Sequence, residues 1–115
     1  MSGLTRESFE DLWARLDAEA QANKFSQEAL LRLSELYRAL DDDERKTVDA
    51  VLRDWVLEGN PRQRFDALAL IDEFIIRDAA SQLRTALERL EHATGPSVPT
   101  DRAKLQRILA RLEER

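Results

Sequence analysis

The sequence predicts an all-α protein, a single domain of five or six antiparallel helices stacked as helical hairpins. Apolar residues recur at three- and four-residue steps through most of the chain, the period of a helix with one buried face. The chain has only three Gly and three Pro, and 36% of its residues are charged, which is typical of helical proteins. With 115 residues, 43% of them hydrophobic, the chain can form one continuous core.

The first two predicted helices occupy the first 40 residues. Residues 5 to 22 carry one apolar stripe, formed by Phe9, Leu12, Trp13, Leu16 and Ala20. The segment NKFS interrupts this pattern, and Ser26 is a suitable N-cap residue for the next helix. The second stripe comprises Leu30, Leu33, Leu36, Tyr37 and Leu40. Both stripes are expected to face the core.

The acidic run DDDE, residues 41 to 44, precedes a third stripe formed by Val48, Val51, Leu52 and Trp55. Acidic side chains complement the positive end of a helix dipole, so we interpret this run as an N-cap with an acidic first turn. It lacks the alternating oxygen ligands and the Gly of a calcium-binding loop. Gly59 is expected to end this helix.

The fourth helix is predicted from Pro61 to about Ile76. Asn60 is expected to cap it, and Pro61 takes the first position, where a missing N–H is tolerated. Its apolar residues, Phe65, Leu68, Ile71, Phe74 and Ile75, surround most of the circumference. This helix should therefore be the most buried element.

Two further helices complete the prediction. Asp78 is expected to cap the fifth, whose apolar side comprises Ala79, Leu83, Ala86, Leu87 and Leu90. A linker at residues 94 to 100 with two of the three prolines precedes a last helix from Thr100 or Asp101. The apolar stripe of that helix, Leu105, Ile108, Leu109 and Leu112, lies opposite Arg102, Lys104, Arg107 and Arg111. This stripe must dock either on this chain or on another.

The stretch PRQRFDALALIDEFIIRDAASQLRTALERL resembles one unit of a HEAT-like helical repeat. The matching positions are the opening Pro61, Arg64, the pair Ala67 and Leu68, and the spacing of Leu83 and Leu87. Gln63 and Asn60 differ from the residues usual in that family. The resemblance implies a binding scaffold with a concave surface. The chain also looks like the small acidic helical immunity proteins of bacteria, which neutralise a toxin.

Catalytic and metal-binding motifs are missing from the sequence. There is no Cys and a single His, and no phosphate-binding, dinucleotide-binding or zinc motif occurs. His92 is predicted near the end of the fifth helix, where a cationic imidazole suits the negative end of the dipole. Arg89 stands where a di-metal helical bundle would place Glu. We therefore expect no enzyme activity, no cofactor and no metal.

The charge distribution indicates a basic protein partner. The net charge is −5, which disfavours binding to nucleic acid phosphates. Residues 1 to 60 carry 8 basic and 14 acidic side chains, whereas residues 61 to 115 carry 10 and 9. No apolar run is long enough to cross a membrane, and no signal peptide is apparent. We expect a cytoplasmic protein that binds neither nucleic acid nor membrane.

An acidic edge is predicted on the fourth helix. Asp66 and Glu73 lie seven residues apart and share a face, with Asp72 beside them. This edge is solvated, or Asp66 and Glu73 pair with Arg62 and Arg77, or the edge meets basic side chains of a partner. Trp13 and Trp55 lie on apolar stripes, so core burial is expected, although Trp is also frequent at binding hot spots.

These observations favour a non-catalytic protein-binding module, most concretely an immunity or antitoxin-type inhibitor that occludes a basic toxic enzyme. The predicted contact residues are Asp41, Asp42, Asp43, Glu44, Asp49, Asp54, Glu58, Asp66, Asp72, Glu73 and Trp55. One alternative is an adaptor or self-associating module that forms a homodimer through the last helix. Another is a small ligand-binding bundle, which predicts an internal pocket with a perturbed acid.

Overall fold

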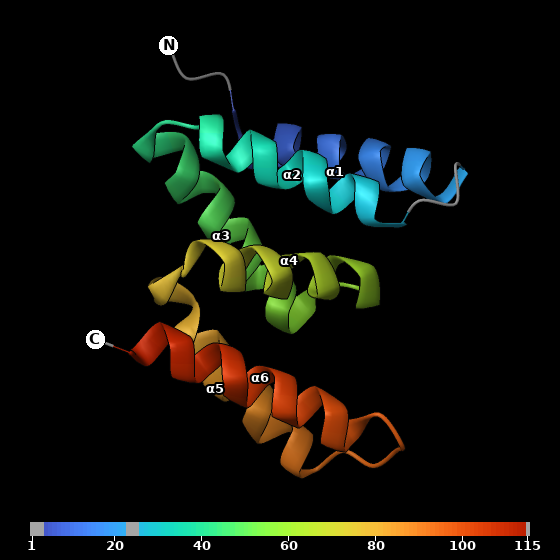
Figure 1. Cartoon of the computed structure of the whole chain (residues 1–115), viewed down its shortest axis with the longest axis vertical. Helices are drawn as coiled ribbons and strands as arrows, with labels where there is room; N and C mark the ends of the chain where they lie inside the picture. The colour runs from blue at the N-terminus through green and yellow to red at the C-terminus, as the bar shows by residue number, and fades with distance from the viewer. Residues whose placement is uncertain (1–3, 23–25, 115) are drawn as a thin grey trace. The chain divides into compact units, whose positions relative to one another are not determined.

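The computed structural model describes residues 4–22 and 26–114, without the side chain of Ser26, and the regular elements of these residues are all helical (Figure 1). The elements are α1 (Arg6–Ala22), α2 (Ser26–Ala39), α3 (Asp42–Glu58), α4 (Pro61–Phe74), the short 3₁₀ helix η1 (Arg77–Ala79), α5 (Ala80–Glu91) and α6 (Val98–Glu113). The all-α prediction is therefore confirmed for this part of the chain, with six α-helices.

The chain divides into two compact units, Met1–Val51 and Leu52–Arg115. The first unit contains α1, α2 and the beginning of α3. The second unit contains the end of α3 and all later elements. A single domain over residues 1 to 115 stays a prediction.

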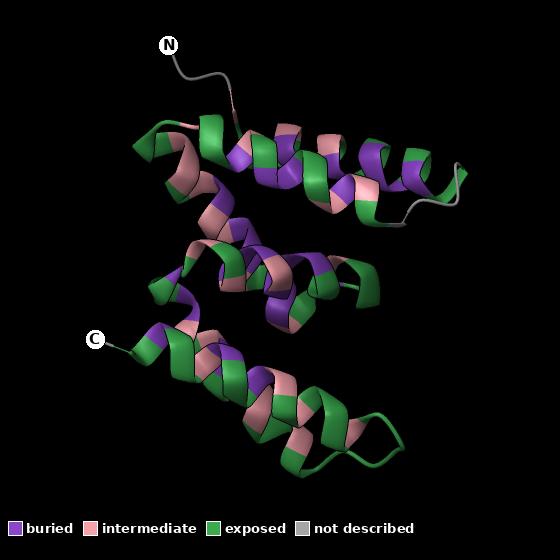
Figure 2. Ribbon diagram, in the orientation of Figure 1, coloured by how far each residue is buried: buried purple, intermediate pink, exposed green. Residues whose placement is uncertain are grey.

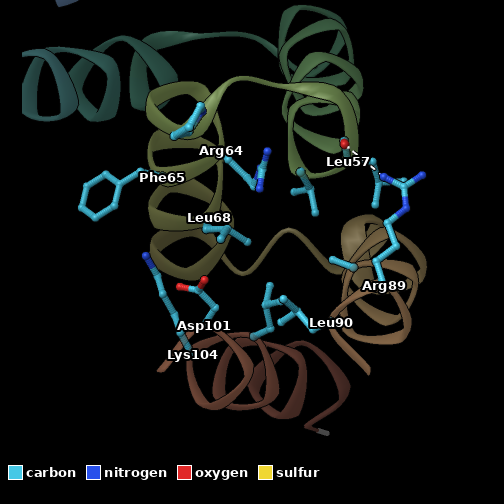
Figure 3. Close-up of a pocket in the computed structure, with 12 residues that line it drawn as sticks. Leu57, Arg64, Phe65, Leu68, Arg89, Leu90, Asp101 and Lys104 are labelled. Atoms are coloured by element: carbon cyan, nitrogen blue, oxygen red, sulfur yellow. Dashed lines mark hydrogen bonds between the residues drawn. The ribbon is translucent and has the colours of Figure 1, made fainter. Parts of the chain in front are cut away.

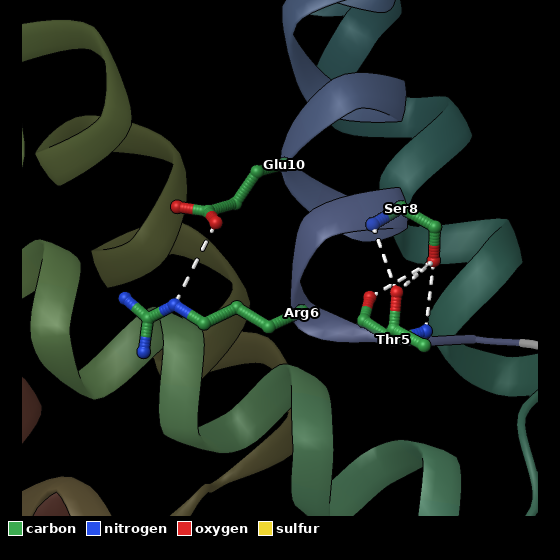
Figure 4. Close-up of polar contacts among 4 residues, drawn as sticks. All are labelled: Thr5, Arg6, Ser8 and Glu10. Carbon is green, nitrogen blue, oxygen red and sulfur yellow. Dashed lines mark hydrogen bonds and ion pairs between the residues drawn. The ribbon is translucent and has the colours of Figure 1, made fainter.

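Helix α1 begins with a reciprocal capping box (Figure 4). The Ser8 backbone N–H donates to Thr5 Oγ1 at 3.1 Å, and the Thr5 N–H donates to Ser8 Oγ at 2.8 Å. One turn along, Arg6 Nε and Glu10 Oε1 form an ion pair at 3.6 Å. Thr5 therefore precedes the helix as its cap, because the box satisfies two N–H groups that the helix leaves unpaired. The predicted capping by Ser26 depends on a side chain that lies outside the described part of the chain.

Helices α3 and α4 begin with capping boxes of the same kind, at the two positions where an N-cap was predicted. The Glu44 N–H donates to Asp41 Oδ1 at 2.8 Å, and Glu44 Oε1 accepts from the Asp41 N–H at 3.2 Å. At α4, the Gln63 N–H donates to Asn60 Oδ1 at 2.8 Å, and the Asn60 N–H donates to Gln63 Oε1 at 3.0 Å. Pro61 lies in the first turn, where its missing N–H is not needed.

The predicted boundaries of the last two helices need correction. Asp78 does not cap α5, because it lies within η1 and forms an ion pair with Arg53 at 3.8 Å. No side chain of the described residues caps α5 at Ala79. Helix α6 begins at Val98, two residues before the predicted start, so the connection after α5 is shorter than residues 94 to 100. Pro99 is compatible with this start because the first turn tolerates proline.

Two helix ends have unusual backbone geometry. Gly59 ends α3 as predicted, although among the described glycines only Gly95 has a positive φ. A Cβ at Gly59 would lie 2.7 Å from the Trp55 carbonyl oxygen, so the missing side chain is what this site requires. Ile75 ends α4 in the left-handed conformation with φ 49° and ψ 60°. A β-branched residue is strained in this conformation, which Gly usually occupies.

Arginine side chains cap the C-terminal ends of several helices. In the first unit, Arg45 donates to the carbonyl oxygens of Tyr37 at 3.2 Å and Arg38 at 3.1 Å, at the end of α2. In the second unit, Arg77 donates to the carbonyl oxygens of Leu112 at 3.0 Å and Glu114 at 2.6 Å, at the end of α6. Each cation satisfies exposed carbonyl groups and lies at the negative end of a helix dipole.

The core of the first unit confirms the predicted stripes in part, because Leu12, Leu30, Leu36 and Leu40 are only half-buried. Helix α1 packs against α2, and Figure 2 shows buried residues recurring along each helix. The buried apolar side chains on these helices are Phe9, Trp13, Leu16, Ala20, Ala29, Leu33 and Tyr37. Leu31 is the exception among the large apolar residues of α2, with 63% of its surface exposed.

The core of the second unit includes the apolar stripe of α6. This helix packs against α5 and α4, and its Leu105, Ile108 and Leu112 are buried. The stripe therefore docks on this chain. The expectation that apolar residues are buried around most of α4 holds only in part, because Phe65 is 56% exposed and Ile75 is 39% exposed.

Candidate functional site

The predicted acidic residues of the first unit have different roles. Asp41 and Glu44 are engaged in the capping box of α3, whereas Asp42 and Asp43 are exposed in the first turn. Asp49 accepts a hydrogen bond of 2.8 Å from the Tyr37 hydroxyl. Burial and this carboxylate raise the pKa of Tyr37 above its usual value. Asp42 and Asp43 are therefore the acids of this run whose carboxylates face solvent.

The acidic edge predicted on α4 is not one continuous surface. Asp66 is buried, with 7% of its surface exposed. Asp72 forms ion pairs at 3.3 Å with Arg107 and Arg111 of α6, so its charge is neutralised within the second unit. Only Glu73 of the three is exposed. Asp72 therefore faces α6, Asp66 lies in the interior, and a partner contact at this edge stays a prediction that Glu73 alone could meet from an exposed position.

The remaining predicted contacts lie near the end of α3. Asp54 and Glu58 are exposed, and Glu58 Oε1 pairs with Arg89 Nη2 at 3.6 Å. Trp55 is 4% exposed. Its ring belongs to the core, as its stripe predicts, and it is not on a surface that a partner could contact.

A cavity of about 370 Å³ opens in the second unit, lined by the end of α3 and by α4, α5 and α6 (Figure 3). We call it the α3–α6 cavity. Its apolar lining comprises Val56, Leu57, Pro61, Phe65, Leu68, Ala86, Leu90 and Leu105. Its charged lining comprises Arg64, Arg89, Lys104 and Asp101. A cavity of this size with few charged groups on an apolar lining is typical of a small-molecule site.

Arg64 and Arg89 are held at the cavity by the end of α3. Arg64 Nη2 donates to the Gly59 carbonyl oxygen at 3.1 Å, and Arg89 Nη1 donates to the Leu57 carbonyl oxygen at 3.1 Å. Each guanidinium has five N–H groups, so each keeps further N–H groups that can donate to a ligand. The two cations are thereby positioned by backbone atoms of α3.

Lys104 lies at the edge of the cavity over the ring of Phe65. Its Nζ is 4.4 Å from the ring centroid, within the range of a cation–π interaction. Burial, followed by the nearby Arg107, lowers the pKa of Lys104 below its usual value. The carboxylates of Asp101 and Asp72 act in the opposite direction and only partly offset these effects, so a further anion would favour the charged ammonium group.

Sequence reasoning missed this cavity. The ligand-binding alternative predicted a pocket with a perturbed acid, whereas the perturbed group found here is a base, Lys104. The lining residues come from four helices and share no spacing in the sequence. The signals in the sequence were the basic face of the last helix and the apolar excess on the fourth helix.

In the part of the chain that the structure describes, no group of three or more His, Cys, Asp or Glu side chains could hold a metal ion. None of the helices described is long and apolar enough to cross a membrane. His92 is exposed at the C-cap of α5, where its backbone N–H donates to the carbonyl oxygens of Arg89 and Leu90.

Comparisons with protein-family models, with curated proteins and with solved structures gave no match to this chain. The fold and the site together define an all-α protein whose second unit contains a largely apolar cavity with three cationic side chains.

Proposed function

We propose that this chain is a non-catalytic protein-binding module with HEAT-like stacked hairpins, most concretely an immunity or antitoxin-type inhibitor that occludes a basic toxic enzyme. The observation that supports this proposal is the location of the net charge. Residues 1–51 carry 7 basic and 12 acidic side chains, and residues 52–115 carry 11 of each. The first unit therefore accounts for the whole net charge of −5.

The contact that we propose centres on the beginning of α3. Asp42 and Asp43 are exposed there, and the capping box of Asp41 and Glu44 fixes the backbone that carries them. Complementary charge on a basic partner would increase the association rate and the specificity of binding more than the affinity itself. Occlusion of the partner's active site would be the mechanism of inhibition.

Self-association through the last helix has less support. Leu105, Ile108 and Leu112 are buried within the second unit, so the apolar stripe of α6 is already covered by its own chain. A homodimer would need another surface. We therefore keep the protein-binding proposal for a different, basic partner.

The experiment that tests this proposal starts with a tagged pull-down from the native host at low salt, with mass spectrometry of the bound proteins. The expected result is a stoichiometric basic protein that stops growth when expressed alone and is neutralised by co-expression of this chain. A partner that is not toxic, or one whose toxicity this chain leaves unchanged, would contradict the inhibitor function. Light scattering of the purified chain would detect a dimer.

Two matched variants locate the contact. The double variant Asp42→Asn and Asp43→Asn leaves both residues of the capping box in place. The control, Asp11→Asn with Glu19→Gln, removes the same charge from exposed positions of α1. We expect the α3 variant to slow association with the partner by about tenfold at low salt, a typical size for electrostatic steering, and the control to have a smaller effect. Equal effects would assign the rate to total charge and contradict a contact at α3.

A further inference from the structure

We infer that the α3–α6 cavity is a binding site for an amphipathic carboxylate with a medium-length aliphatic chain, such as a fatty acid of eight to ten carbons. The inference concerns residues of the second unit alone. It does not depend on the protein partner proposed for the first unit.

The volume of the cavity sets the size of the ligand. The volume of about 370 Å³ lies at the lower end of the range for small-molecule sites, about 300–1,000 Å³. A ligand of about a dozen non-hydrogen atoms, such as decanoate, has the small size that suits such a site. Leu68 and Leu90 point into the space between the four helices (Figure 3), so an aliphatic chain would contact aliphatic side chains.

The charge of the lining sets the sign of the head group. Arg64, Arg89 and Lys104 face one acid, Asp101, and Glu58 pairs with Arg89 from outside the lining. Arg64, and at the edge of the cavity Lys104, on which Asp101 and Asp72 also act, are thus the cations whose charge a ligand could meet. The Arg64 side chain extends into the space between the helices (Figure 3), where its remaining N–H groups could donate to a carboxylate.

Lys104 provides independent support at the edge of the cavity. Its ammonium group lies over the Phe65 ring at 4.4 Å, and burial together with Arg107 makes its charge less favourable. A carboxylate would offset both effects, and its binding should raise the pKa of Lys104.

The experiment measures binding of decanoate to the full chain by isothermal titration calorimetry, below the concentration at which decanoate forms micelles. Decan-1-ol has the same chain and no charge, and it serves as the matched ligand. We expect decanoate to bind at least about tenfold more tightly, because a hydrogen bond to a charged group exceeds the free energy of a tenfold change. Amide shifts in an NMR titration should be confined to α3–α6.

Three variants separate the charge from the cavity. Lys104→Gln should weaken decanoate binding by about tenfold without affecting decan-1-ol, and Arg102→Gln, on the same helix but outside the lining, should leave both unchanged. Ala86→Leu fills the cavity and should abolish binding of both ligands. Equal affinities for the two ligands, no binding of decanoate at millimolar concentration, or full binding by Ala86→Leu would each overturn the inference.

Discussion

The close contact at Gly59 makes a quantitative prediction for Gly59→Ala. The new Cβ would lie 2.7 Å from the Trp55 carbonyl oxygen, 3.0 Å from Trp55 Cα and 3.1 Å from Gln63 Cβ. Two of these three atoms belong to the backbone of α3, which cannot move aside as a flexible side chain can. The substitution must therefore shift the junction between α3 and α4.

Two opposing effects determine how much Gly59→Ala changes the free energy of unfolding. Overpacking of this kind costs about 1–3 kcal/mol, whereas Ala in place of Gly stabilises by about 0.4–1 kcal/mol through the unfolded state. Taken at the midpoints of the two ranges, the difference is a loss of about 1.3 kcal/mol in the free energy of unfolding. At about 4–8 °C for each kcal/mol, the melting temperature should fall by about 5–10 °C.

The assay uses the two tryptophans, which lie in different units. In a Trp13→Phe background the fluorescence of Trp55 reports on the second unit, and in a Trp55→Phe background Trp13 reports on the first. Urea unfolding of Gly59→Ala should shift the Trp55 transition to lower denaturant. The control is Gly95→Ala, where no atom lies within 4 Å of the new Cβ and only the positive φ opposes the change. An unchanged or higher Trp55 midpoint in Gly59→Ala would refute the reasoning.

The remaining predictions concern the polar network, one cap and the core. Burial raises the pKa of Tyr37 above its unfolded value, so stability should be complete below about pH 10 and decrease as the pH rises above it. Tyr37→Phe should lack this decrease. The variant loses the hydrogen bond to Asp49, so its free energy of unfolding should be lower by about 0.5–1.5 kcal/mol. The absorbance of the chain's one Tyr follows its titration directly. Asn60→Ala should lower the unfolding free energy by about 1 kcal/mol, and a neutral effect in urea titrations would argue against the capping box of α4. Ile108→Ala should lower the free energy of unfolding by about 2–5 kcal/mol. Leu31→Ala, at an exposed position, should change it by no more than about 0.5 kcal/mol. Similar losses in the two variants would contradict the burial of Ile108 and the exposure of Leu31.

Local signals predicted the helices well because their causes lie within a few residues. The caps at Asp41 and Asn60 each require a partner three residues along the chain, and that spacing is visible in the sequence. The start of α5 was predicted less well. Asp78 has the side chain of a cap, but its carboxylate pairs instead with Arg53, a residue far away in the sequence.

The candidate contact residues show the same limit. Their charges could be read from the sequence, but their exposure could not. Asp72 is neutralised by Arg107 and Arg111, and Asp66 is buried. The neutralisation of Asp72 depends on α6 packing against α4, a contact between segments about 35 residues apart.

The sequence by itself determined the all-α class, most of the helix boundaries, and the concentration of negative charge in the first half. These properties follow from helical periodicity, from capping within one turn and from composition, all of which are local. Only the tertiary structure decided where the stripe of α6 docks and which acids remain exposed. It also formed the α3–α6 cavity, since a cavity requires side chains from several helices and no single helix carries its pattern.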